Sequence, residues 1–262
     1  MSRIVALVAA ALVTAGCATG SEPAGPALQQ TADKLGSIRS GDLTLELELD
    51  PRGEGATWGF TIDGRFALPE EGALPVLDVE YAQRRGDESE TVRLVSDGER
   101  AVVESRGRRI ELDEAAFAQL RGATGGDDGP AAAAQRLRIE SWLVDPELSD
   151  GPDGTDRIDG ELDLVAVANG LAQASAALEG SEPALLDESD AERLREAVDS
   201  AEFELLTGED DRLLRRLALD VSLGVDVPEE LREALGDDVV GADLSFLLEI
   251  RDPNRPVEVR LP

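Results

Sequence analysis

The sequence predicts an α+β protein built on a highly curved antiparallel β-sheet. Apolar and polar residues alternate over residues 43–49 and again over residues 58–68. Alternate side chains of a strand point to opposite faces, so each stretch has one apolar and one polar face. The segment between them, residues 50–55, contains the Pro and Gly that a hairpin turn needs. Gly64 falls at a core-facing position and is expected to let the second strand bend.

A meander of short strands follows, and helices then interrupt it. Short turns and renewed alternation predict strands at residues 77–81, 92–94, 102–103, 110–112, 158–164, 203–205, 217–225, 244–250 and 257–261. Apolar residues at helical spacing predict helices at residues 29–38, 113–120, 131–137, 165–178, 190–198 and 228–235. Strands towards both ends of the chain, with helices between them, are typical of an α+β layer protein.

Two features in the middle of the chain have alternative interpretations. Trp142 is either a lid over the apolar face or an ordinary core residue, which is the usual fate of a buried Trp. Residues 150–160 repeat Asp at every third position, whereas an EF-hand loop places its ligands at every second position and ends in Glu. This spacing favours a turn before a strand over a calcium site.

The amino terminus has the organisation of a secretion signal. Arg3 precedes an apolar run at residues 4–13, which is shorter than the ~20 residues that span a bilayer. Residues 14–17, Thr-Ala-Gly-Cys, resemble the bacterial lipobox, in which the cysteine becomes the new amino terminus and carries a diacylglycerol. One departure is Thr14, where lipoboxes prefer Leu.

The lipobox divides the chain into three parts. We expect residues 1–16 to be a lipoprotein signal peptide, Cys17 to be lipidated, and residues 17–27 to be a flexible tether rich in Gly, Ser, Pro and Ala. Residues 28–262 then form the working domain. The expected location is the extracytoplasmic face of the cell membrane, or elsewhere in the cell envelope, with the lipid on Cys17 as the anchor.

Composition excludes several classes of function. The formal charge of −31 repels nucleic acid and anionic lipid headgroups. The chain has no His, and Cys17 is its single Cys, which excludes Ser-His-Asp and Cys-His catalysis and any His-based metal site. No Gly-rich loop of the phosphate-binding type is present, and no pair of carboxylates stands out. We therefore expect no enzymatic activity, no cofactor and no metal.

Three local patterns and the order of the elements point to a family. The patterns are Ser96-Asp97-Gly98 followed by Ala101-Val102-Val103 and Arg109-Ile110-Glu111-Leu112; Trp142-Leu143 with Asp145-Pro146 before Asp159-Gly160; and residues 244–251 followed by Asp252-Pro253-Asn254-Arg255-Pro256-Val257. With the lipobox, they resemble the LppX/LprG type of actinobacterial lipoprotein, which has a LolA-like fold. The resemblance covers residues 28–262.

The resemblance implies a half-open β-barrel wrapped around helices, with an apolar cavity that binds acylated lipids or glycolipids and carries them within the envelope. Aromatic residues make up only 3% of the chain, so the inner face is mostly Leu and Val, which suits acyl chains. The residues expected to contact those chains share the apolar parity of long strands: Leu45, Leu47, Trp58, Phe60, Ile62, Leu219, Val221, Phe246 and Leu248.

Two alternatives stay open at this point. The same alternation suits a closed, dry core equally well. The alternative function is a non-catalytic envelope adaptor that acts on a protein partner through its acidic surface, with residues 122–130, rich in Gly and Asp, as a binding loop or a simple connection.

Overall fold

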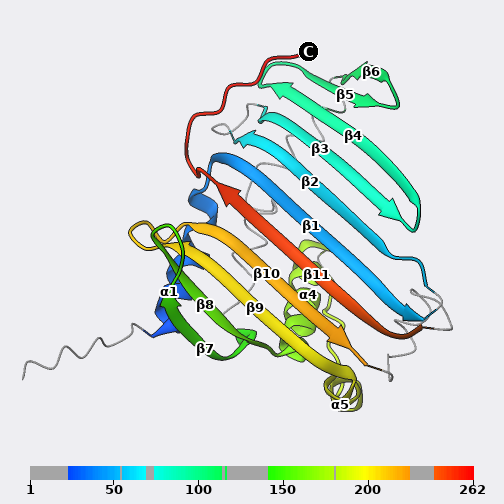
Figure 1. Cartoon of the computed structure of the whole chain (residues 1–262), viewed down its shortest axis with the longest axis vertical. Coiled ribbons are helices and arrows are strands. Elements are labelled where there is room, and N and C mark those ends of the chain that lie inside the picture. The colour runs from blue at the N-terminus through cyan, green and yellow to red at the C-terminus, as the bar shows by residue number, and fades with distance from the viewer. Residues whose placement is uncertain are drawn as a thin grey trace, which may run out of the picture.

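The computed structural model describes residues 23–53, 55–68, 74–113, 116, 141–179, 181–224 and 239–262. They form one antiparallel sheet with helices on one side (Figure 1). The elements are α1 (Ala24–Lys34), a 3₁₀ turn (Leu35–Ser37), β1 (Ser40–Gly53), β2 (Trp58–Ala67), β3 (Val76–Arg85), β4 (Glu88–Asp97), β5 (Ala101–Ser105), β6 (Arg108–Glu111), β7 (Leu143–Asp150), β8 (Thr155–Leu162), α4 (Leu164–Glu179), α5 (Glu188–Ala197), β9 (Val198–Gly208), β10 (Leu214–Leu223) and β11 (Val239–Arg251).

The sheet has 11 strands in the order β6-β5-β4-β3-β2-β1-β11-β10-β9-β8-β7. The first and last strands of the chain are therefore neighbours in the middle of the sheet, paired from Asp42–Arg251 to Gly53–Val239. Between β6 and β7 the chain passes from one edge of the sheet to the other. Because β6 and β7 are the two edges and do not pair, the sheet is an open, curved half-barrel, which confirms the predicted fold class.

A glycine in β2 allows two strands to approach closely. Gly64 has φ +150°, and a Cβ added there would lie 2.1 Å from the carbonyl oxygen of Asp78 on β3. An L side chain cannot occupy that space. The close approach of the β2 and β3 backbones is the physical reason for a glycine at position 64, and the bend expected there stays a prediction.

The core lies between the helices and one half of the sheet. In Figure 1, α1, α4 and α5 lie on the far side of the sheet, behind its β7–β11 half. Ala27 and Leu28 of α1 pack with Ile158, Phe203 and further residues of β8, β9 and β10 in one cluster. Burial of large apolar side chains such as these contributes about 1.5–3 kcal/mol each.

Trp142 belongs to this core, with 8% of its surface exposed. Its indole packs against Gly170 of α4, where an added Cβ would lie 2.7 Å from Nε1. Of the two interpretations of Trp142, the structure supports the core residue. α4 begins just after Asp163, whose carboxylate accepts hydrogen bonds from the backbone N–H of Val165 and Ala166 at 3.0 and 3.1 Å.

Residues 151–154 form the turn between β7 and β8, and residues 155–160 belong to β8, so residues 150–160 are a turn before a strand as the spacing of their Asp residues favours. The N–H of Gly151 donates to the carbonyl of Thr155 at 2.8 Å, and Asp153 and Gly154 adopt positive φ. Within the described part of the chain, no group of three or more His, Cys, Asp or Glu is arranged to hold a metal ion.

Three local predictions differ from the structure. The predicted strand 257–261 is absent; residues 252–262 instead run past the ends of the strands towards β6 (Figure 1). They are tied there by the Ser40 hydroxyl, which donates to the carbonyl of Arg255 at 2.6 Å, and by Arg109, which donates to Pro262 at 2.7 Å. An extended segment can satisfy its backbone at the strand ends without joining the sheet, which alternation alone does not reveal.

The other two differences concern the limit of a helix and a strand that was not predicted. α1 begins at Ala24, inside the range expected for the tether, because Ala24 and Ala27 are buried in the core. β7 lies at residues 143–150, where no strand was predicted, and passes Asp145-Pro146 by means of a bulge between Val144 and Glu147.

Several predictions lie outside the described residues. They are the signal peptide, Cys17, most of the helix at 113–120, the loop 122–130, and the helices at 131–137 and 228–235. The described start of the first of these helices agrees with the prediction, because the Asp113 carboxylate accepts a hydrogen bond from the backbone N–H of Ala116 at 2.9 Å.

Candidate functional site: the apolar face of the central strands

The register brings all of the predicted lipid-contacting residues onto one face of four neighbouring strands. Leu45 lies opposite Ile62 on one side and opposite Leu248 on the other. Leu47 in the same way lies between Phe60 and Phe246. Directly opposed residues of an antiparallel pair point to the same face, so β2, β1, β11 and β10 form one continuous apolar surface. Trp58, Leu219 and Val221 extend it, each opposite a residue of the same face.

All of these side chains are half-buried, although they do not share the same surroundings. Leu219, Val221 and Leu248 pack against the core cluster. Among the described residues, that cluster does not include the remaining six, which we call the open patch: Leu45, Leu47, Trp58, Phe60, Ile62 and Phe246. The apolar face is thus divided into a part that completes a dry core and the open patch beside it.

An aromatic group lies at the β2–β3 side of the open patch. The ring of Phe60 lies 5.9 Å from the rings of both Trp58 and Tyr81, edge-on to the first and tilted to the second. Tyr81 pairs with Ile62 and Gln83 pairs with Phe60, so both polar side chains lie on the apolar face. The Tyr81 hydroxyl donates to Oε1 of Gln83 at 3.2 Å.

Tyr81 and Gln83 are site residues that the sequence-based list omits. Their signal was nevertheless present, since Tyr81 has the parity of Leu77 and Val79, and Gln83 continues it. Both are polar residues at positions that alternation assigns to the apolar face.

Burial changes along the strands next to the open patch. In β4, Val95 and Ser96 are almost completely buried, Val92 and Leu94 are half-buried, and residues 88–91 are all exposed. β3 is half-buried from Val76 to Gln83 except for the exposed Glu80, and it ends in the exposed Arg84 and Arg85. The apolar face therefore has a closed end near Ser96 and an open end near Gln83 and Arg85.

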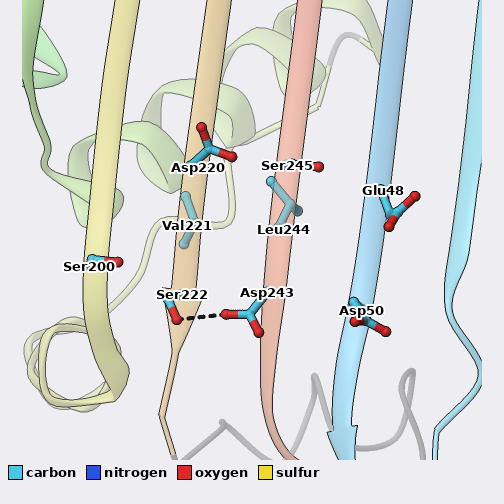
Figure 2. Close-up of a pocket in the computed structure, with 9 residues that line it drawn as sticks. All are labelled: Glu48, Asp50, Ser200, Asp220, Val221, Ser222, Asp243, Leu244 and Ser245. Atoms are coloured by element: carbon cyan, nitrogen blue, oxygen red, sulfur yellow. Dashed lines mark hydrogen bonds between the residues drawn. The ribbon is translucent and has the colours of Figure 1, made fainter.

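The opposite face of the same strands is acidic. Figure 2 shows a shallow pocket on this face, where Glu48, Asp50, Asp220 and Asp243 of three neighbouring strands stand on the near side of the sheet. Ser222 donates to Asp243 at 2.6 Å. Val221 and Leu244 border the pocket through their backbone, while their side chains belong to the apolar face. Strand alternation thus separates an acidic outer face from an apolar inner face.

Arg52 is one of the cations of this outer face; another is Arg84, which pairs with Glu48. The Arg52 guanidinium lies 3.3 Å from a carboxylate oxygen of Asp199 and 3.2 Å from one of Asp243, and it also donates to the hydroxyl of Ser222 at 2.7 Å. These contacts join β1, β9, β10 and β11. Exposed ion pairs of this kind contribute only about 0–1 kcal/mol each, so the network mainly keeps acidic strands in register.

Two carboxyl groups with displaced pKa values lie in turns. The N–H of Arg100 donates to Asp97 in the β4–β5 turn and lowers the pKa of that carboxyl. In the β9–β10 turn, burial raises the pKa of Asp211, but the N–H of Leu213 and the guanidinium of Arg215 outweigh this effect and leave the pKa lowered. Both carboxylates stabilise their turns by accepting hydrogen bonds from backbone N–H groups.

The comparisons with known proteins are limited. No protein-family model matches the chain, and no curated protein matches it. Among solved structures, the crystal structure of LprF from Mycobacterium bovis matches 92% of this chain and 98% of that chain, with 12% sequence identity and a TM-score of 0.44. No helix within the described residues has the length and hydropathy to cross a membrane.

Proposed function

We propose that this protein is a non-enzymatic envelope lipoprotein that binds the acyl chains of a lipid or glycolipid on its apolar face and carries the lipid within the cell envelope. One observation carries the proposal: the open patch is a continuous apolar surface outside the described core. Each methylene that leaves water for such a surface contributes about 0.8 kcal/mol. Acyl chains therefore gain ample free energy there even after the cost of ordering them.

The expected anchor complements this role. A lipidated Cys17, followed by a tether that ends where α1 begins at Ala24, would keep the domain beside the membrane that supplies the lipid. Loading and release require only that the acyl chains exchange one apolar environment for another, so no catalytic group is needed.

The test compares neighbouring residues on opposite faces of β2. Phe60→Asp places a carboxylate on the open patch, whereas Thr61→Asp places one on the outer face beside Glu46. Each protein is purified from its own envelope and examined by native mass spectrometry, with the fold checked by circular dichroism. We expect bound lipid in the wild type and in Thr61→Asp and its loss in Phe60→Asp. A lipid-free mass for the wild type, with no uptake of fluorescent acyl probes, would refute lipid binding.

The acidic outer face supports a second candidate, a non-catalytic adaptor that acts on an envelope protein. Four carboxylates line the pocket of Figure 2. Arg52 and Arg84 pair with two of them, Asp243 and Glu48, so a partner would present basic residues to the remaining acidic charge. This candidate predicts that Asp220→Asn with Asp243→Asn abolishes function in cells, while Phe60→Asp leaves it intact.

A further inference from the structure

We infer that the open patch holds an acyl chain in one direction only, with a neutral ester carbonyl at Tyr81 and Gln83 and the methyl end towards Ser96. This inference rests on the proposed function and specifies the orientation and head chemistry of the ligand. Four observations support it: the polar pair, the burial gradient, the length of the face and the charges beside the pair.

The polar pair supplies hydrogen-bond donors beside a patch whose own donor is the indole N–H of Trp58. Tyr81 donates its hydroxyl proton to Oε1 of Gln83, which leaves the amide N–H groups of Gln83 available to other acceptors. Among the described residues, the amide nitrogen of Gln83 has no hydrogen-bond partner. A ligand that rests on Phe60, directly opposite Gln83, and offers a carbonyl oxygen would satisfy this donor.

The burial gradient fixes the direction. The end near Gln83 leads to the exposed residues Arg85 and Glu88, which lie opposite each other. At the other end, Ser96 and its partner Ala101 have no exposed surface. The polar part of a lipid must stay in contact with water, so it belongs at the open end, and the methyl terminus belongs at the closed end.

The length of the face matches one acyl chain. Leu77, which lies opposite the buried Ser96, is six residue steps from Gln83 along β3. At about 3.3 Å per residue this is a span of roughly 20 Å. An acyl chain in one leaflet of a bilayer occupies about half of the ~30 Å hydrocarbon thickness. The face therefore accommodates an ordinary membrane acyl chain, with its end at Ser96.

The charges beside the pair favour an ester over a free fatty acid. Glu90 lies directly opposite Gln83 on the same face and pairs with Arg106 at 2.9 Å. A ligand carboxylate at Gln83 would lie next to this carboxylate and within the field of a chain with a formal charge of −31. A neutral carbonyl avoids that repulsion and still accepts the hydrogen bond.

The test uses three probes of equal chain length on the full chain carrying Cys17→Ser: dodecane, methyl dodecanoate and dodecanoate. Affinity is measured by displacement of a fluorescent acyl probe. We expect the ester to bind about fivefold more tightly than the alkane, as for one neutral hydrogen bond. Gln83→Met should bring that ratio close to one without weakening dodecane binding. Thr61→Val, on the outer face, should leave both affinities unchanged.

A second measurement tests the closed end. Lengthening the ester from methyl dodecanoate to methyl hexadecanoate should strengthen binding, whereas methyl tetracosanoate should gain nothing further. A continued gain with length would overturn the closed end at Ser96. Equal binding of ester and alkane to the wild type, or tightest binding of dodecanoate, would overturn the role of Tyr81 and Gln83 while leaving lipid binding intact. Binding of none of the probes would refute the proposed function itself.

Discussion

The hydroxyl of Thr31 lies 2.9 Å from the hydroxyl of Thr207, although 176 residues separate them in the chain. Thr31 is 1% exposed and Thr207 is fully buried. The contact connects α1 to the end of β9, and Lys34 reinforces it by donating to the backbone carbonyl of Asp211 at 2.8 Å. The helix that follows the tether is thereby held on the β9–β10 hairpin at a fixed position.

We expect this hydroxyl pair to stabilise the domain measurably. Thr31→Val keeps the shape but removes one of the two partners of the buried Thr207 hydroxyl, which also donates to the carbonyl of Leu213 at 3.3 Å. The free energy of unfolding should fall by about 0.5–1.5 kcal/mol. Urea unfolding of Thr31→Val, Thr207→Val and the double variant forms a double-mutant cycle. A coupling energy of about 0.5–1.5 kcal/mol is the expected result, and strict additivity would show that the two hydroxyls do not interact.

Gly64→Ala should destabilise the protein strongly because the new Cβ meets the carbonyl oxygen of Asp78, a backbone atom that cannot rotate away. The expected loss exceeds 2 kcal/mol, of the order of other severe overpacking effects (about 1–3 kcal/mol or more). Gly25→Ala is the matched control, since no atom lies within 4 Å of its added Cβ and Gly25 lies inside α1. That change should be neutral or stabilise by up to about 1 kcal/mol. Thermal unfolding of the two variants compares them directly.

Acid should remove the stabilising contribution of Asp211. Its pKa is lower in the folded chain than its ordinary value of 3.8, so the contribution is complete above that value and is lost as the pH falls through the folded-state pKa. Asp211→Asn should lower the free energy of unfolding by about 1 kcal/mol at pH 7, a figure discounted for the partial exposure of the side chain.

The informative quantity is the difference in the free energy of unfolding between the wild type and Asp211→Asn, since many other carboxylates titrate in the same range. It should shrink as the pH falls below about 4. A difference that stays constant from neutral pH to pH 2.5 in urea titrations would contradict the proposed role of the Asp211 charge.

Cys17→Ser should release the protein from membranes. The expected diacylglycerol on Cys17 supplies more than one acyl chain, and two or more chains are needed for firm anchoring. Fractionation of cells that express the wild type and the variant measures the change. Equal retention of both proteins in the membrane fraction would contradict anchoring through Cys17.

The sequence alone determined the local features of the fold. Alternation of period two in β1, β2, β10 and β11 depends only on neighbouring residues, so it identified the strands and the face on which Leu45, Phe60 and Phe246 lie together. The single Cys and the absence of His likewise excluded Ser-His-Asp and Cys-His catalysis and His-based metal sites, whatever the fold.

Only the tertiary structure decided which parts of the apolar face become core. Leu219 and Leu45 have the same alternating pattern, but α1 and α4 lie over the β7–β11 half of the sheet, so Leu219 packs against the core whereas Leu45 belongs to the open patch. The pairing of β1 with β11 and the path of residues 252–262 past the strand ends also depend on tertiary contacts and not on local periodicity. Alternation of apolar and polar residues shows which side of a strand is apolar. What covers that side depends on residues distant in the chain, about which local periodicity contains no information.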